Sequence, residues 1–204
     1  MRRPGRGFAV CPVQKWSCTL EPGKQQDSVT HRGTQSPHPC TAKPGWCDHL
    51  NLKNPKVDLA AVQSTLRKHG LDCHAISAYG NPVELVMERL ETLKALGGYA
   101  LVRGSAGPDV SVKSFADSLL PLVKRAEALG VTLAIENHGQ AAIDSIDSMV
   151  ELCRLVPSPG LGIALAPIHL YRRNERTEDA VQALRGRIAF FYAWDWGPSA
   201  DKNW

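Results

Sequence analysis

No apolar run in this sequence approaches the roughly 20 residues that a membrane-spanning helix needs. The arginines near the N-terminus are not followed by the apolar segment of a secretory signal. We therefore expect a cytoplasmic protein that binds no membrane. Neither G-x-G-x-x-G nor G-x-x-x-x-G-K followed by Ser or Thr occurs, which argues against the common dinucleotide and P-loop nucleotide sites.

Closely spaced cysteine pairs are also lacking. Four of the six cysteines lie in the first 50 residues, but 6, 21 and 6 residues separate them, unlike the C-x2-4-C pairs of most zinc sites. Cys11, Cys18, Cys40 and Cys47 therefore do not predict a zinc module.

Residues 1–50 lack any helical or alternating apolar pattern and hold six of the fourteen prolines. They carry seven Lys/Arg against three Asp/Glu, whereas residues 51–204 carry seventeen of each. Two interpretations of this head stay open: a disordered basic segment, or sequence foreign to the domain, added by a misplaced start codon or a frame error. Because the charge excess belongs to the head, the domain at 51–204 lacks a basic face, and we expect no nucleic-acid partner.

From about residue 58 the chain alternates short apolar runs with helical stripes, several of which end at glycine. The strand starts recur at intervals of 27 to 32 residues, close to the length of a βα unit. The predicted helices span residues 59–69, 82–96, 112–129, 143–155 and 177–184, and the predicted strands span residues 72–77, 99–104, 131–139, 161–166 and 188–195.

Strands this apolar indicate a parallel sheet that is covered on both faces. The fold class is α/β, and two architectures agree with the pattern: an incomplete (β/α)8 TIM barrel of about five βα units, or an open doubly wound sheet. Polar residues follow one strand after another, among them Arg103, Glu136 and His169. That distribution favours the barrel, whose chemistry sits at the carboxyl ends of its strands.

Glu136 is the main candidate for chemistry, because it directly follows the apolar run at residues 133–135. A carboxylate in such a place needs a partner, since burial of an unpaired charge costs free energy. At the mouth of a parallel barrel this group binds a metal or moves a proton. A salt bridge at the rim is the alternative, and the residue alone does not decide between them.

Three segments occur in the order AEALGVTLAIENHG (126–139), PGLGIALAPIHL (159–170) and RIAFFYAWD (187–195). Together they resemble the xylose isomerase-like TIM barrels, which are sugar-phosphate isomerases and epimerases with hydroxypyruvate isomerase and endonuclease IV as relatives. The resemblance covers residues 58–197. It implies a divalent metal at the barrel mouth, held by Glu, Asp, His and Glu, with two carboxylates that move protons between adjacent sugar carbons.

The resemblance makes Glu136 both a metal ligand and the catalytic base, with Mn²⁺, Mg²⁺ or Zn²⁺ as the ion. Ala166 stands where the family's Asp-x-x-His motif has its Asp, and Tyr192 stands where a His ligand is expected. The second Glu has no counterpart. The expected contacts to the substrate, a sugar or sugar phosphate, come from the residues His138, His169 and Asp195.

Three functions follow from these residues. The first is a sugar (phosphate) isomerase or epimerase that works by metal-assisted proton transfer. The second is a catalytically inactive or fragmentary relative with at most weak sugar binding, which the residues at 166 and 192 favour. The third is an endonuclease IV-like phosphodiesterase, which would need more histidine ligands than residues 51–204 offer.

The number of βα units bears on assembly. A full barrel takes about 250 residues, whereas the regular part of this chain holds five predicted strands. An incomplete barrel exposes strand edges, and we therefore expect homo-oligomers.

Overall fold

The computed structural model describes residues 58–193. These residues fall into two compact units, divided between residues 72 and 73. The predicted head at 1–50 lies outside the described residues, so its character and the domain boundary at residue 51 stay predictions. Within residues 58–193, none of the helices combines the length and apolar character that crossing a membrane requires.

Helix α1 (Leu59–Lys68) belongs to the first unit. Oδ1 of Asp58 caps its start by accepting hydrogen bonds from the N–H groups of Ala60 at 2.9 Å and Ala61 at 3.2 Å. The chain leaves the helix through Gly70, whose φ of 61° is the left-handed conformation that glycine adopts without strain. The predicted helix and its N-cap are therefore confirmed.

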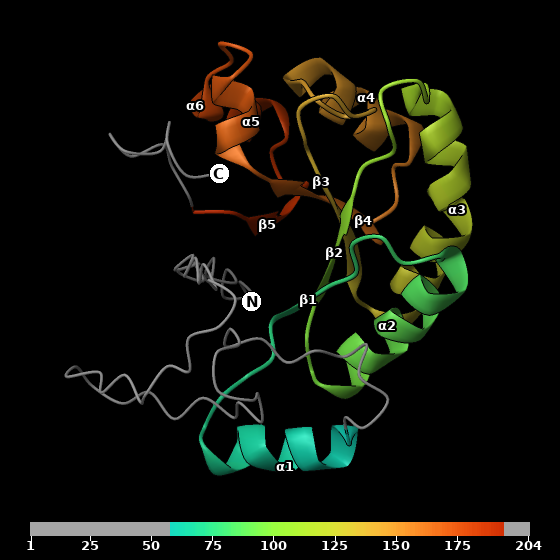
Figure 1. Ribbon diagram of the computed structural model, residues 1–204, viewed down its shortest axis with the longest axis vertical. Coiled ribbons are helices and arrows are strands. Elements are labelled where there is room, and N and C mark those ends of the chain that lie inside the picture. Colours follow the sequence, from blue (N-terminus) through green and yellow to red (C-terminus); the bar gives the residue numbers. More distant parts are fainter. Residues whose placement is uncertain (1–57, 194–204) are drawn as a thin grey trace, which may run out of the picture. The chain divides into compact units, whose positions relative to one another are not determined.

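The second unit contains one parallel sheet whose strands are neighbours in the order of the chain (Figure 1). A doubly wound sheet would instead reverse its strand order at a switch point. The arrangement is thus that of a (β/α)8-type barrel, represented by five strands. These strands are β1 (Ala75–Ser77), β2 (Ala100–Gly104), β3 (Thr132–Glu136), β4 (Leu161–Leu165) and β5 (Ile188–Phe191).

Helices follow each of the first four strands, and α2, α3 and α4 lie along one face of the sheet (Figure 1). Buried leucines on α2 and α3, among them Leu90 and Leu119, build the core on this face. Ser111 caps α3 and Gly130 ends it at a φ of 67°. The helices are α2 (Val83–Ala95), α3 (Val112–Leu129), α4 (Ile146–Leu155), α5 (Pro167–Tyr171) and α6 (Thr177–Ala183).

Two expectations need correction. The predicted strands at 72–77, 131–139 and 188–195 are shorter in the structure, because pairing with the neighbouring strand covers only β1, β3 and β5 as observed. Helix α5 was not expected from the sequence. Its five residues are too few to show a helical period, although Pro167 occupies the first helical position, where proline is favoured.

The other face of the sheet, which we call the inner face, carries small residues. Val102, Ala134 and Ala164 form a buried cluster on β2, β3 and β4, and Phe190 and Tyr192 pack against it. Side chains two apart in a strand share a face, so Glu136 lies on the inner face with Ala134. The inner face therefore leads directly to the carboxyl end of β3.

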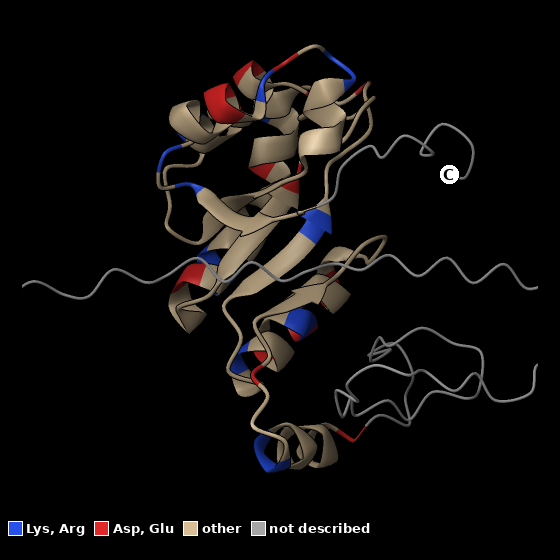
Figure 2. Ribbon diagram, turned by 90° about the vertical axis from the view of Figure 1, so that its left-hand side faces the viewer, with Lys and Arg blue, Asp and Glu red and all other residues tan. Residues whose placement is uncertain are grey.

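Charged residues are rare in the sheet. Figure 2 shows the strands almost wholly in tan, with most Lys, Arg, Asp and Glu on helices and loops. Within the five strands the charged residues are Arg103 and Glu136, each at or next to the carboxyl end of its strand. A buried strand keeps a charge only where some partner or cavity offsets the cost of burial, so both positions are candidates for function.

Gly160, just before β4, tests the packing of the sheet against α3. A Cβ there would lie 2.5 Å from the carbonyl oxygen of Val123 and 2.9 Å from the amide nitrogen of Glu127. We expect Gly160→Ala to lower the free energy of unfolding by about 1–3 kcal/mol, as overpacking does, measured by urea unfolding.

Gly107→Ala is the matched control, because a Cβ at residue 107 meets nothing within 4 Å. Its free energy of unfolding should change by at most about 1 kcal/mol. Equal stability of the two variants would show that the tight packing at residue 160 is not present in solution.

Candidate functional site

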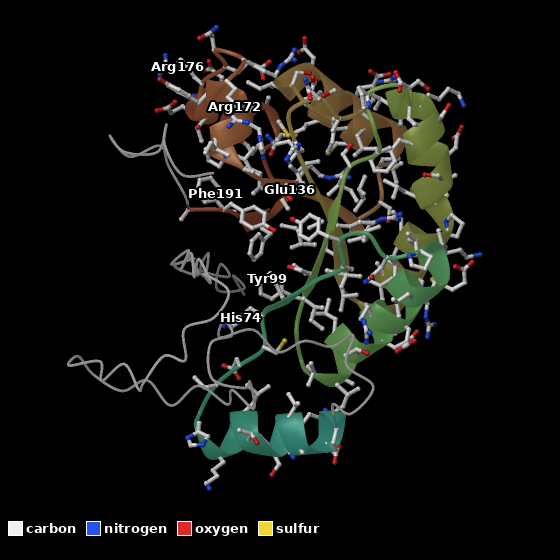
Figure 3. All side chains as sticks on the ribbon, in the orientation of Figure 1. His74, Tyr99, Glu136, Arg172, Arg176 and Phe191 are labelled. Carbon is white, nitrogen blue, oxygen red and sulfur yellow. The ribbon has the colours of Figure 1, made fainter. Side chains whose placement is uncertain are left out.

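Glu136 is the last residue of β3 and lies on the inner face, away from α2 and α3 (Figure 3). Its side chain is buried, with 7% of the residue exposed. Its register partners are Gly104 on β2 and Ala164 on β4. Because glycine and alanine have small side chains, the neighbouring strands leave room for other side chains to reach the carboxyl group.

Two tyrosines reach this carboxyl group. Tyr79, two residues after β1, donates a hydrogen bond from its hydroxyl to Oε2 of Glu136. The hydroxyl oxygens of Tyr79 and Tyr192 lie 2.6 Å apart. Since a phenol has one proton to give, Tyr192 is the donor to Tyr79 when Glu136 is ionised. The three groups form one hydrogen-bonded chain contributed by the carboxyl ends of β1, β3 and β5.

The pKa values in this chain differ from their usual ranges. Burial raises the pKa of Glu136, and the Tyr79 hydrogen bond and the nearby His138 partly lower it. Burial also raises the pKa of Tyr79, and it raises the pKa of Tyr192 to about 12. Both phenols therefore keep their protons at neutral pH. Glu136 has a raised proton affinity, which suits a group that accepts and returns a proton.

Two histidines form the next part of the site. The rings of His138 and His169 have centroids 4.1 Å apart and planes inclined at 46°. Nδ1 of His138 lies 2.8 Å from the carbonyl oxygen of Gly139, which can only accept, so Nδ1 donates to it. His169 is buried in α5, and burial, then His138 and Arg172, lower its pKa to about 4.

Asn137 fixes the backbone between β3 and α5. It is fully buried, its Oδ1 accepts a hydrogen bond from the amide of Ala166 at 2.7 Å, and its Nδ2 donates to the carbonyl oxygen of Ala166 at 3.1 Å. The amide side chain thus satisfies both main-chain groups of one residue. This fixes the start of α5, and with it His169.

The groups beside Glu136 fit a tight divalent-metal site poorly. Ala166 has no donor atom in its side chain, and the hydroxyl of Tyr192 is bonded to Tyr79. Mg²⁺ or Mn²⁺ needs several oxygen ligands. In the part of the chain that the structure describes, no group of three or more His, Cys, Asp or Glu residues is placed to hold an ion. Glu136 as a metal ligand therefore stays a prediction.

The structure brings three of the predicted site residues together: Glu136, His138 and His169 lie at the same edge of the sheet. The fourth, Asp195, lies outside the described residues. Sequence reasoning missed Tyr79. One signal in the sequence could have found it: Tyr79 comes just after a short predicted strand, at the same edge of the sheet as Glu136.

Tyr79→Phe tests the hydrogen bond to Glu136. That bond lowers the pKa of the carboxyl group against the effect of burial, so its removal should raise the pKa of Glu136 further. Carbon-13 NMR titration of the glutamate carboxyl carbons measures the change. Tyr99→Phe, which removes a hydroxyl from another tyrosine with 38% exposure, should leave the Glu136 titration in place, and the same shift in both variants would refute the assignment.

His169 makes stability depend on pH. Its pKa is lowered from 6.5 to about 4 in the folded chain, so the unfolded chain binds more protons between these values and stability falls as pH decreases. The wild type should therefore lose unfolding free energy between pH 6.5 and pH 4 that His169→Gln does not lose. Urea unfolding of both proteins at the two pH values measures the difference. His74→Gln is the control, because it retains His169 and should lose as much stability on acidification as the wild type. If the stability difference between the wild type and His169→Gln did not depend on pH, the burial of His169 would be contradicted.

Comparison with known proteins identifies the family. A profile of the xylose isomerase-like TIM barrel family matches residues 37–203. No curated protein sequence matches the chain. Among solved structures, L-ribulose 3-epimerase is similar at a TM-score of 0.59 and 18% identity, over 68% of this chain and 55% of that chain. The apo 3-keto-D-glucoside 4-epimerase of E. coli is similar at 0.56 and 16%, over 65% and 62%.

A third similar structure is the IOLI protein with a bound zinc atom, at a TM-score of 0.54 and 19% identity, over 67% of this chain and 56% of that chain. At these identities the likeness shows the fold. The chain spans 55% to 62% of the length of these three structures. Because the family profile covers most of the sequence, the chain belongs to the xylose isomerase-like TIM barrel family.

Proposed function

We propose that the chain takes part in isomerisation or epimerisation of a sugar or sugar phosphate, with Glu136 as the base. The observation that supports this most is a buried carboxyl group at the carboxyl end of a barrel strand, with a raised pKa and a hydrogen bond from Tyr79. That end of a barrel strand is where TIM-barrel enzymes place their chemistry. The proposal also agrees with the family to which the chain belongs and with the two sugar epimerases among the similar structures.

In the proposed reaction, Glu136 removes the proton from the sugar carbon next to the carbonyl group. The electron pair moves to the carbonyl oxygen and gives an enediolate. Delivery of a proton from water on the opposite face of the same carbon gives the epimer, and Glu136 then passes its own proton to solvent. Return of the proton from Glu136 to the adjacent carbon gives the isomer, while the hydroxyl proton moves from one sugar oxygen to the other. The Tyr79 hydroxyl, already beside Glu136, would donate to oxygen where negative charge develops.

Substrate binding would fall to the histidines and to Asp195. His169 is neutral at neutral pH because its pKa is about 4, and a neutral imidazole both donates to and accepts from sugar hydroxyls. His138 would contact the sugar through Nε2, since its Nδ1 is bonded to the carbonyl oxygen of Gly139. A cytoplasmic location and homo-oligomers stay predictions.

A divalent metal, Mn²⁺, Mg²⁺ or Zn²⁺, would polarise the sugar carbonyl if it bound at Glu136. The donor set among residues 58–193 does not fit a tight site, and no step above is assigned to an ion. Ala166 and Tyr192 stand where the resemblance expects metal ligands. This observation favours a second candidate function, a protein that binds sugar without catalysing its conversion.

Exchange of substrate hydrogen for solvent deuterium tests the proposal. The purified chain is incubated in D2O with a panel of ketoses, aldoses and their phosphates, and deuterium beside the carbonyl carbon is followed by NMR. We expect exchange with at least one sugar, slowed by about 10²–10⁴-fold in Glu136→Gln, the usual contribution of a catalytic base. Glu88→Gln, at an exposed carboxylate with 65% side-chain exposure, is the control and should retain the wild-type rate.

The same assay with added Mn²⁺, Mg²⁺ or Zn²⁺ separates the alternatives. Stoichiometric metal that is lost in Glu136→Ala, together with metal-dependent exchange, would favour the metal-assisted reaction. Saturable sugar binding without exchange under any condition would favour the binding protein and overturn the proposed catalysis.

A further inference from the structure

A cavity lies on the other side of the sheet from Glu136. Its volume is about 260 Å³, and its walls come from the loops after β1 and β2 and from α3. Arg103, Asn81 and Ser105 supply its polar lining, and Phe115 and Ser118 close it on the side of α3. We call it the Arg103 pocket. Arg103 pairs in register with Ile135, one residue before Glu136, so the two side chains point to opposite faces of the sheet.

Arg103 is a half-buried cation, and residues 58–193 place no opposite charge beside it. Among the described residues it makes no ion pair or hydrogen bond, and no Asp or Glu lines the pocket. Burial lowers its pKa, and no carboxylate opposes that effect. An arginine stays protonated under all ordinary conditions and offers five N–H donors in a planar fork. The cost of burying this charge is offset if an anion enters the pocket.

Two other polar side chains of the pocket, Asn81 and Ser105, are also able to donate. Asn81 is buried, with 7% of the residue exposed, and has no hydrogen bond among residues 58–193. Oγ of Ser105 accepts a hydrogen bond from the amide of Ile143 at 3.1 Å, which leaves its own proton to give. Ser118 is different, because its hydroxyl donates to the carbonyl oxygen of Phe115 at 2.7 Å. The pocket therefore combines one guanidinium, one amide and one hydroxyl as donors.

We propose that the Arg103 pocket binds a small oxyanion, the phosphate or carboxylate group of a small metabolite. A guanidinium fork matches either group with two parallel hydrogen bonds. The volume of about 260 Å³ is enough for a phosphate ester of a few carbons. The site is separate from Glu136, so the inference stands whether or not proton transfer occurs there.

Titration of the folded chain with methyl phosphate and with acetate, at constant ionic strength, tests the pocket. Binding is followed by NMR of amides in the loops after β1 and β2. We expect saturable binding of at least one of the two anions. Arg103→Gln should weaken it at least about tenfold, since a hydrogen bond to a charged group contributes about 1.5–3 kcal/mol. Arg103→Lys keeps the charge without the fork and should bind less tightly than the wild type but more tightly than Arg103→Gln.

Arg125→Gln is the matched control, because Arg125 lies exposed on α3 and pairs with Glu91. It should bind the anion as the wild type does. Ser105→Ala provides a second variant in the pocket and should also weaken binding. Stronger binding of methyl phosphate assigns a phosphate ligand, and stronger binding of acetate assigns a carboxylate. No saturable binding of either, or equal weakening by Arg125→Gln and a folded Arg103→Gln, would overturn the proposal.

Discussion

Parallel pairing of three central strands sets the chemistry of this chain. In that register Gly104, Glu136 and Ala164 lie side by side at the carboxyl end of the sheet. Two of them have almost no side chain, so the carboxyl group between them is buried without being crowded. A single residue of slip would turn Glu136 to the helix side and replace it with Ile135 or Asn137, since side chains alternate between faces. The position of Glu136 on the inner face therefore depends on the register of β2, β3 and β4.

The ionised form of the buried carboxyl group is stabilised first by a hydrogen bond and then by the nearby His138. Tyr79 donates to Glu136, and Tyr192 lies within hydrogen-bonding distance of Tyr79. Such a chain leaves the carboxyl proton affinity higher than usual, because burial outweighs the stabilising bonds. A metal would have the reverse effect, since it favours the ionised form. The neighbours of Glu136 therefore decide whether it behaves as a base or as a ligand.

The sequence was sufficient for the repeating pattern and for the place of Glu136 at the end of a strand, because both depend on local signals. Apolar runs at a βα period predict the strands, and Glu136 stands out as a charge directly after one of them. Tyr79 could not be found in this way, since its bond to Glu136 joins residues 57 apart in the chain. Helix α5 was missed because one and a half turns carry no period. The pocket of Arg103 depends on how two loops and α3 meet, which no single segment encodes.

Asn137 carries a consequence for how such a protein changes over time. Its amide holds both main-chain groups of Ala166, and those groups are the same for any residue except proline. These two hydrogen bonds therefore do not depend on which side chain position 166 presents. Because Ala166 is itself buried, a carboxylate there would still need a partner to offset the cost of burial, so the side chain at position 166 can change only together with its neighbours.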